Sequence, residues 1–539
     1  MNAMLRLLAQ SRSQAPYLAL GLLISLIATL SAVSLSGAAG AVFAGVSLAA
    51  LPLALRLLGP ARVVLRYAER MITHDALFRA TADLRVWFFR CIAVRMAGGL
   101  GMQRAGDLLS RLVGDLEAQD TVYMRLMLPL AGAVILLPLL ALSIGLYETT
   151  LAVLVCLLFA LSAFILPAWA GRAALANGEA LAQAMGGLRV GALDVATGLR
   201  EARAFAAEDR MLAGVQAREA ALLATQSRAA KRVAWAGAGA FIAAQAAILA
   251  TLVLGRNQGA VDVGLVFIVL AAFEAVSLLP RAGAQAGTAA AAAKRVLAIT
   301  DAPIKCPDPA NPQTMPASSA LRIEAVSFAW QPDRPPVFED LNLDIPEGHH
   351  VALLGPSGIG KSTLAALLLR LAAPQSGRIL LGGTDIAGLA ASELRARIGW
   401  LSQATHLFDD TIRANLLMAR PDADDETLWH ALTQAQIADA VRALPDGLDT
   451  YLGEGGLRFS GGQGRRLALA RALLSPARIL ILDEPCAGLD SETERAFLQV
   501  LAEATADRTT ILIAHHLTGV ERLDRIYRLS AGHAMAAAG

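Results

Sequence analysis

The sequence predicts a multi-domain membrane protein in which an all-α domain of six spanning helices is followed by an α/β domain. Three observations predict this fold class. The 539-residue chain is 55% hydrophobic and only 17% charged, with a mean hydropathy of +0.52, whereas charged residues make up about 25% of a typical soluble domain. Long apolar runs are confined to the first half of the chain. The second half has short apolar runs between helical stretches, as in a parallel sheet.

Six apolar runs in the first half are long enough to cross a bilayer, which takes about 20 helical residues. The chain is rich in arginine between the second and third runs and between the fourth and fifth, whereas the other connections carry few charges. By the positive-inside rule, we expect the arginine-rich segments and both termini in the cytoplasm, with the first span an uncleaved anchor. The predicted spans lie near 15–36, 40–59, 126–146, 149–170, 234–255 and 261–280.

A proline-rich stretch separates the two folds, because prolines recur from Pro303 to Pro316 and break any helix there. We therefore expect a transmembrane domain over residues 1–299, a linker over 300–320 and an α/β domain over 321–539. In that last domain the continuous apolar runs at 351–354, 479–482 and 510–514 are typical of buried parallel strands.

Composition excludes some functions. The net charge is only +2 and aromatic residues make up 5% of the chain, so no basic, aromatic-rich surface for nucleic acid is predicted. The four cysteines are scattered, without the spacing of a metal site or a disulfide framework. We interpret them as small apolar residues.

The segment 355–363 reads GPSGIGKST, directly after one predicted strand and at the start of a helix. Glycines there let backbone N–H groups turn inward around phosphates, while Lys361 reaches the terminal phosphates and the Ser362 hydroxyl can bind Mg²⁺. A chance glycine-rich turn would not have a strand before it, a helix after it and the complete spacing. The predicted nucleotide-binding residues of this loop are Gly355, Ser357, Gly358, Gly360, Lys361, Ser362 and Thr363.

A second motif, ILILDEP at 479–485, is acidic and places Asp483 and Glu484 at the end of a buried strand. Asp483 suits Mg²⁺ coordination, and Glu484 suits polarising an attacking water, because phosphoryl transfer depends on positioning and charge stabilisation. The alternative is a solvated turn. The phosphate-binding pattern upstream favours the catalytic interpretation.

Residues 460–463 read SGGQ just before a predicted helix, and together with the two motifs above this pattern resembles the ATP-binding cassette (ABC) family. The resemblance implies that this signature caps ATP bound by the opposite domain of a dimer, which suits a hydroxyl, glycine N–H groups and a helix N-terminus. The segment at 453–456 resembles the loop of exporters in that family, which disfavours an importer. The implied signature residues are Ser460, Gly461, Gly462 and Gln463.

Further single positions match the family pattern. The resemblance implies that Gln403 binds Mg²⁺ and links the nucleotide state to the membrane helices, that Asp490 contributes from the following loop, and that His515 senses the γ-phosphate. A surface histidine is the alternative for His515. Trp330 occupies the position of an adenine-stacking tyrosine, and core packing is an equally good interpretation. The departures, Phe459 for the usual leucine and Cys486 in place of a small polar residue, remove no reactive group.

In the membrane part, residues 66–75 read RYAERMITHD and residues 201–209 read EARAFAAED. With the segments at 84–89 and 106–111, these resemble the CydC family, whose members form heterodimeric CydDC exporters. The resemblance implies a bacterial inner-membrane, multi-pass protein with a CydD-like partner, serving cytochrome bd assembly. Its implied substrate is a small thiol, cysteine or glutathione, or heme.

Arg66, Arg70 and His74 recur every four residues, so they share one helical face near the membrane. A neutral imidazole can bind the iron of heme b, and arginines can bind propionates or the carboxylates of a thiol peptide. The alternative is an ordinary positive-inside stripe, which explains the arginines but not the histidine. Glu274 lies within the sixth predicted span, where a charge is costly, so we expect it to face a cavity or a partner.

The leading hypothesis is therefore an ATP-driven exporter with alternating access. An ATP-gated heme-binding sensor or channel is a different class of function that the same residues permit. A lipid flippase is a third, supported by the shared fold alone.

Overall fold

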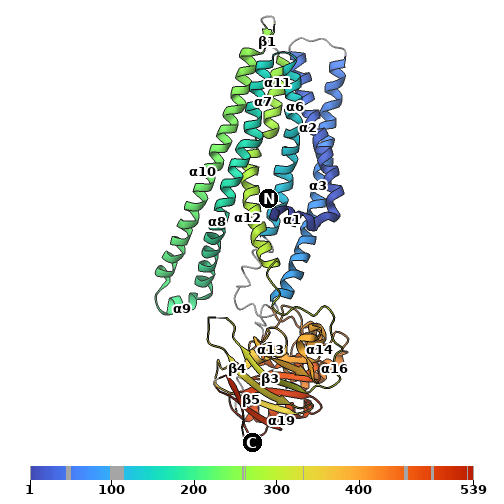
Figure 1. Ribbon diagram of the computed structural model, residues 1–539, viewed down its shortest axis with the longest axis vertical. Coiled ribbons are helices and arrows are strands. Elements are labelled where there is room, and N and C mark those ends of the chain that lie inside the picture. Colours follow the sequence, from blue (N-terminus) through green and yellow to red (C-terminus); the bar gives the residue numbers. More distant parts are fainter. Residues whose placement is uncertain are drawn as a thin grey trace. The chain divides into compact units, whose positions relative to one another are not determined.

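The computed structural model describes residues 2–43, 50–96, 114–257, 260–261, 263–331, 333–453, 459–486, 491–530 and 532–537. The chain divides into two compact units, one ending at Pro303 and the other beginning at Ile304 (Figure 1). This division falls within the predicted proline-rich linker. Each unit is described by itself.

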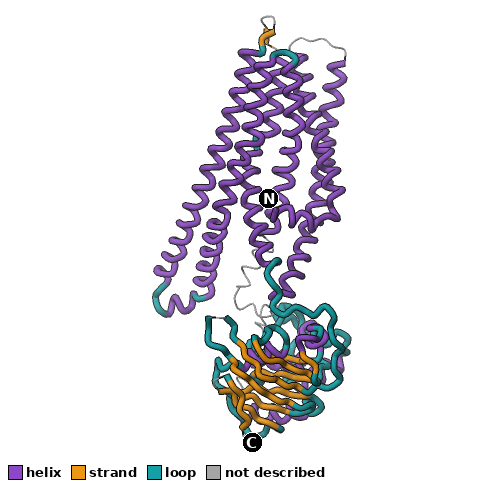
Figure 2. The backbone as a smooth tube through the Cα atoms, viewed as in Figure 1, coloured by secondary structure: helices purple, strands orange, loops and turns teal. Residues whose placement is uncertain are grey.

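The first unit is built from long helices, with one short strand pair, β1 and β2 (Figure 2). Its sequence has few turn signals, so helices continue far beyond the length of a membrane span. The elements are α1 (Asn2–Leu8), η1 (Ala9–Gln14), α2 (Ala15–Phe43), α3 (Ala50–Met96), α5 (Leu116–Val122), η4 (Tyr123–Met127), α6 (Leu128–Gly145), α7 (Thr149–Ala160), η5 (Leu161–Ile165), α8 (Leu166–Thr197), α9 (Leu199–Ala204), α10 (Glu208–Leu254), β1 (Arg256–Asn257), β2 (Ala260–Val261), α11 (Val263–Val276) and α12 (Leu279–Thr300).

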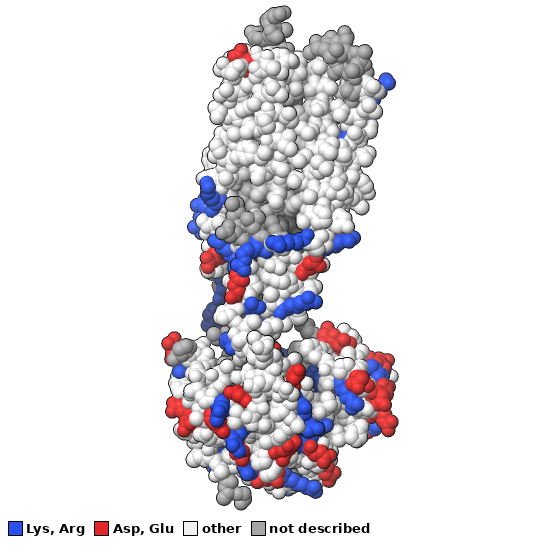
Figure 3. All heavy atoms as spheres, turned by 45° about the vertical axis from the view of Figure 1, so that its right-hand side comes forward, with Lys and Arg blue, Asp and Glu red and all other residues white. Residues whose placement is uncertain are grey.

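Five helical stretches within the described ranges are long and apolar enough to cross a membrane: Arg12–Phe43, Leu116–Gly145, Thr149–Thr197, Glu208–Leu254 and Val263–Thr300. The predicted span at 40–59 is not among them, and residues 44–49 of it lie outside the described residues. The unit is nearly free of charge over much of the face in Figure 3, and Lys and Arg gather in a band at one level. This pattern is typical of a membrane-spanning bundle.

The predicted break between the first two spans, near residues 36 to 40, is wrong, because α2 continues to Phe43. The glycines there serve close helix packing. A Cβ on Gly40 would lie 2.9 Å from the Cα of Gly264 in α11, and one on Gly37 would lie 2.9 Å from the Ile268 side chain. The sixth predicted span is divided instead, since α11 ends at Val276 and α12 begins at Leu279, with a proline in its first turn.

Helices α8 and α12 approach each other through glycine. A Cβ on Gly283 would lie 2.2 Å from the carbonyl oxygen of Pro167, and one on Gly287 would lie 2.2 Å from that of Gly171. Any side chain at either position would separate the two backbones. Small residues at such crossings are the usual means of close helix association in a membrane.

The second unit is an α/β fold with a separate antiparallel sheet. The sequence predicts this fold class, and the structure confirms it. Its elements are β3 (Leu321–Phe328), β4 (Phe338–Ile345), β5 (His350–Leu354), α13 (Lys361–Leu368), β6 (Ser376–Leu381), β7 (Thr384–Asp385), η6 (Ile386–Gly388), α14 (Ala391–Ala396), β8 (Ile398–Leu401), α15 (Ile412–Leu417), α16 (Asp425–Gln434), α17 (Ala438–Arg442), η7 (Gly447–Asp449), α18 (Gly461–Leu474), β9 (Ile479–Asp483), α19 (Ser491–Ala504), β10 (Thr509–Ala514), β11 (Arg525–Ser530) and β12 (His533–Ala537).

The main sheet has the order β12-β11-β5-β10-β9-β8 among the described strands, parallel except for β12. Residues 479–482 are completely buried in it, as their continuous apolar run predicts. The register pairs Leu354 with Ala514 and Ile513 with Asp483. The carboxyl ends of β5, β10 and β9 therefore meet at one edge, which is where α/β sheets bind ligands.

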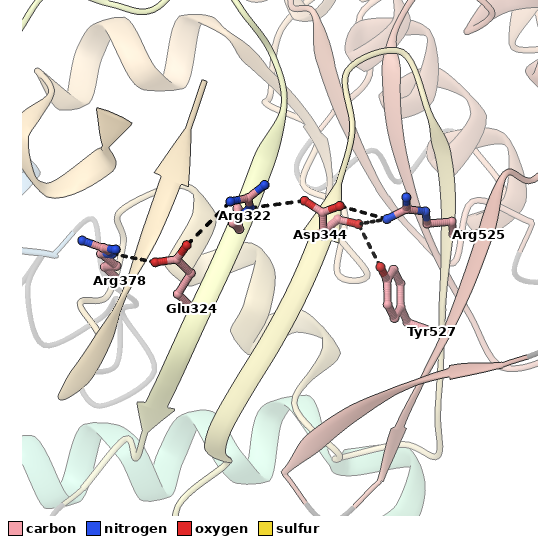
Figure 4. A network of polar contacts seen from close by, with 6 residues as sticks. All are labelled: Arg322, Glu324, Asp344, Arg378, Arg525 and Tyr527. Atoms are coloured by element: carbon pink, nitrogen blue, oxygen red, sulfur yellow. Dashed lines mark hydrogen bonds and ion pairs between the residues drawn. The ribbon is translucent and has the colours of Figure 1, made fainter. Parts of the chain in front are cut away.

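The second, antiparallel sheet has the order β4-β3-β6-β7. An exposed network of polar contacts runs from it to β11 of the main sheet (Figure 4). Asp344 is its centre, because its carboxylate pairs with two arginines and its carbonyl accepts a hydrogen bond from a tyrosine hydroxyl 2.8 Å away. Exposed pairs of this kind contribute about 0.2–1 kcal/mol each. The network comprises Arg322, Glu324, Asp344, Arg378, Arg525 and Tyr527.

Candidate active site

The glycine-rich loop lies between β5 and α13, as its spacing predicts. Gly358 and Gly360 have φ angles of +82° and +114°, in the left-handed region that favours glycine. At Gly360 a Cβ would also lie 2.4 Å from the Val337 side chain. This backbone turns the loop so that α13 begins at Lys361, with its N–H groups available to an anion. Ser357 is exposed on the loop.

Lys361 is nearly buried, with 6% of its surface exposed. Its Nζ donates to the carbonyl oxygen of Gly355 at 2.6 Å and lies 3.3 Å from Nδ1 of His515. Burial lowers the pKa of the ammonium group, against the opposing effect of the Glu484 and Asp483 carboxylates. Because the ammonium group is removed from water, a negatively charged ligand beside it would stabilise its charged form.

Asp483 ends β9 and is 2% exposed. Its Oδ2 accepts a hydrogen bond from the Ser362 hydroxyl at 2.8 Å. Burial raises the pKa of this carboxyl group, although Ser362 and Lys361 oppose the shift. A hydroxyl and a carboxylate side by side are hard oxygen ligands, and they fit Mg²⁺, which keeps several waters and takes one or two protein ligands beside phosphate.

Glu484, the next residue, has the left-handed φ of +50°. Its N–H donates to the carbonyl oxygen of Ile513 at 2.9 Å, which fixes the turn against β10. Its Oε1 lies 2.8 Å from Nε2 of His515 and accepts a hydrogen bond from Nε2 of Gln403 at 3.1 Å. The structure thus brings together the three residues that the sequence predicts as catalytic.

Ser460 caps α18, since its hydroxyl accepts from the N–H of Gln463 at 3.3 Å and its own N–H donates to the Gln463 side chain at 3.0 Å. This reciprocal pair is a capping box. Beside it, Gly461 and Gly462 leave open space at their Cβ positions. The helix therefore presents a hydroxyl and glycine N–H groups to the outside.

Sequence reasoning missed the contacts of Arg465. Its Nη2 donates to the carbonyl oxygen of Asp483 at 2.6 Å and its Nη1 donates to that of Gln403 at 3.2 Å. The guanidinium group joins the signature helix α18 to the ends of β9 and β8. Arg465 follows SGGQ by two residues, and its position gives no signal of which carbonyl groups it meets.

Trp330 donates from Nε1 to the Thr363 hydroxyl, 3.1 Å away on the first turn of α13. Its ring packs edge-on against Phe328 with centroids 5.1 Å apart, and 45% of the residue is exposed. The ring is thus partly packed and partly exposed, and adenine stacking and core packing both stay predictions for Trp330. Asp490 lies outside the described residues, so its predicted place is not assigned.

The candidate residues of the membrane part lie on two helices, three on α3 and one on α11. His74, on α3, is half-buried, and its Nδ1 is 2.9 Å from the carbonyl oxygen of Arg70. Arg66 pairs at 3.6 Å with the buried Glu69, and Arg70 is exposed. Glu274 is exposed on α11 and makes no ion pair with a described residue. The structure brings Arg70 and His74 together and does not bring Glu274 to them.

Comparison with known proteins identifies the family to which this chain belongs. The ABC transporter family profile matches residues 338–487. The CydC protein of Escherichia coli K12, named a glutathione/L-cysteine transport system ATP-binding/permease protein, is 34% identical over 87% of this chain and 82% of its own length. The chain belongs to the CydC family of ABC exporters.

Two further similarities support this assignment. The structure of a bacterial Atm1-family ABC exporter with ATP bound superposes with a TM-score of 0.84 at 26% identity, covering 97% of this chain and 94% of that one. An ATP-dependent lipid A-core flippase of Chromobacterium violaceum is 43% identical, but over only 45% of this chain and 41% of its own length. The Escherichia coli CydC protein is therefore matched over most of its length, whereas the flippase is matched over less than half of its length.

The location, the activity and the cofactors of the chain follow from its membership of the CydC family. The chain is a multi-pass inner-membrane protein with an ABC domain, and it couples ATP hydrolysis to transport. ATP and Mg²⁺ are its nucleotide and metal. When bound, Mg²⁺ neutralises charge on the transferred phosphoryl group.

Proposed function

We propose that this chain is the CydC-like half of a heterodimeric exporter that moves cysteine or glutathione across the bacterial inner membrane. The observation that carries the proposal is the contact of Glu484 with both His515 and Gln403, beside Lys361 and Asp483. These residues form a complete hydrolytic half-site. The name of the Escherichia coli relative supports the substrate class.

In this half-site each residue has a distinct role. Lys361 binds the terminal phosphates, and Ser362 with Asp483 holds the metal. Glu484 orients and polarises the attacking water, while His515 and Gln403 fix the position of its carboxylate through the 2.8 Å and 3.1 Å contacts. Trp330 offers its exposed ring to the adenine.

A partner completes the site. The N-terminus of α18 is open at Gly461 and Gly462, where no described atom lies within 4 Å of an added Cβ, and the exposed Ser460 lies beside them. This is the surface that would cap ATP bound by a second nucleotide domain, and a CydD-like half-transporter is the partner that family membership favours. We place both termini in the cytoplasm, since the arginine-rich segments follow the positive-inside rule.

The test uses the purified pair in inside-out vesicles. ATP should drive accumulation of cysteine or glutathione against a gradient, and Glu484→Gln should abolish that accumulation. Continued passage of substrate through the Glu484→Gln protein would instead favour an ATP-gated channel. Movement of labelled lipid without thiol would favour a flippase. Loss of cytochrome bd assembly in cells carrying Glu484→Gln would connect transport to that process.

Heme b is a second candidate ligand or substrate, and the geometry of His74 favours it. A carbonyl oxygen only accepts hydrogen bonds, so the contact with Arg70 places the proton on Nδ1 of His74. The lone pair on Nε2 then stays available to iron, and the exposed Arg70 can bind a propionate. His74→Ala should remove the Soret absorbance of the purified pair, whereas His516→Ala should not. An unchanged spectrum in His74→Ala would exclude His74 as the ligand of the heme iron.

A further inference from the structure

A cavity of about 470 Å³, partly open to the outside, lies between α8, α10 and α12 of the helical unit. Its size is within the usual range for small-molecule sites. All three helices reach it where they leave a predicted span, since its lining residues fall at 170–177, 229–234 and 281–288. The cavity is therefore at the edge of the membrane-spanning part.

The lining of the cavity is mostly apolar, and its charged groups are all positive. Alanine side chains form most of the wall, and the polar groups are Asn177, Arg232, Arg281, Gln285 and Thr288. No Asp or Glu is among the described residues that line it. Within the same set of residues, neither Arg232 nor Arg281 makes an ion pair. Two guanidinium groups without a carboxylate partner leave the cavity positively charged.

Neighbouring groups orient the amides. Arg125 donates from Nη1 to Oε1 of Gln285 at 3.4 Å, and the NH₂ group of Gln285 has no acceptor among the described residues. Asn177 donates from Nδ2 to the carbonyl oxygen of Ala173 at 2.7 Å, which leaves its Oδ1 as an acceptor. The cavity thus combines two cations and the amide donor of Gln285 with an acceptor, Oδ1 of Asn177, suited to an ammonium or peptide N–H.

We propose that this cavity binds the transported solute as a small peptide or amino acid through its carboxylates, with Arg232 and Arg281 as the binding cations. Guanidinium groups match carboxylates in two-pronged geometry, and the alanine wall leaves room for the rest of the molecule. This inference rests on the proposed function, because it names the site at which a thiol peptide such as glutathione is held before transport.

The test measures glutathione binding to the purified heterodimer in phosphatidylcholine nanodiscs, without ATP, by titration calorimetry. Arg232→Gln and Arg281→Gln should each raise the Kd at least tenfold. Arg228→Gln makes the same charge change one turn away on α10, at a position outside the cavity lining, and should leave the Kd unchanged. Glutathione diethyl ester, which lacks both carboxylates, should bind the unaltered protein no better than glutathione binds the Arg281→Gln variant.

A second variant tests the cavity without altering charge. Ala230→Trp fills the space with an indole and should abolish binding while basal ATP hydrolysis continues, which shows that the protein is folded. Equal Kd values for glutathione and its ester, or unchanged Kd in the arginine variants, would overturn the proposal. So would Arg232-dependent enrichment of phosphatidylglycerol in a parallel preparation of mixed phosphatidylcholine and phosphatidylglycerol nanodiscs, with no glutathione binding, because the occupant would then be a lipid headgroup.

The same preparation separates this inference from the proposed function. ATP-driven accumulation of thiol in vesicles without arginine-dependent binding would remove only the cavity site. Arginine-dependent binding without ATP-driven accumulation would remove the exporter proposal and leave the cavity as a binding site. In the first case the KM for transport should also be unaffected by Arg232→Gln.

Discussion

Oε1 of Glu484 lies 2.8 Å from Nε2 of His515, although the two residues come from different strand ends. Adjacent parallel strands β9 and β10 bring them together, and the left-handed backbone of Glu484 turns its side chain into this contact. In the proposed function, this pair would polarise the water that attacks the terminal phosphate.

Glu484→Gln should reduce the rate of ATP hydrolysis by roughly 100-fold or more, since a positioned base contributes at least that factor. The amide keeps the size of the side chain and its contact with Gln403, so ATP affinity should change little. Steady-state hydrolysis and equilibrium binding of a fluorescent ATP analogue measure the two effects. Hydrolysis close to the unaltered rate would show that another group activates the water. His516→Ala, at a residue 3.8 Å from Glu494 and outside the site, is the control.

Arg465→Gln should lower the rate of ATP hydrolysis, because Asp483 and Gln403 would lose the contacts that hold them in place. The guanidinium group meets the carbonyl oxygens of the buried Asp483 and the exposed Gln403, and leaving the buried acceptor unsatisfied costs about 1–3 kcal/mol. Thermal unfolding and the kcat for ATP are the measurements, and kcat should fall more than affinity. Arg465→Lys restores charge without the two-pronged geometry and should recover little activity. Full recovery with lysine would mean that charge alone matters.

Gly287→Ala should destabilise the helical unit. The added methyl would lie 2.2 Å from the carbonyl oxygen of Gly171, so α8 and α12 must move apart, at a cost of about 1–3 kcal/mol for overpacking. The unfolding temperature in detergent should fall. Gly237→Ala is the matched control, because nothing lies within 4 Å of its added methyl. An equal fall in both variants would point to a general helix effect.

Cys486 should resist alkylation in the folded protein. Burial raises the pKa of its thiol to about 12, so the reactive thiolate is scarce at pH 8 and increases only as the pH approaches that value. Iodoacetamide labelling followed by peptide mass spectrometry should find Cys486 unmodified in the folded state. The same residue should react readily in guanidinium chloride, where the thiol has its ordinary pKa near 8.5. Fast labelling of the folded chain would contradict this expectation.

Local patterns predict the nucleotide half-site because its residues follow short strands directly. The loop before Lys361 and the acidic pair at Asp483 and Glu484 need only their own strand and turn to be recognised. Their meeting with His515 follows from the shared edge of a parallel sheet. The fold class was predicted from hydropathy and these motifs, and the structure and comparisons agree with it.

Features that depend on packing between distant segments could not be predicted in this way. Gly37 and Gly40 look like helix breakers, yet they allow α11 to approach α2. Arg465 looks like a surface charge on a basic helix, and only the fold brings it to Asp483. The cavity lined by Arg232 and Arg281 likewise combines residues from helices far apart in the sequence.

The glycine crossing of α8 and α12 has a mechanical consequence. The backbones of the two helices approach each other closely at Gly171 and Gly287, where no side chains separate them. We therefore expect α8 and α12 to move together as one rigid body. They supply two walls of the cavity, and α10 supplies the third. We therefore expect the volume of the cavity to change when α10 is displaced relative to this pair of helices.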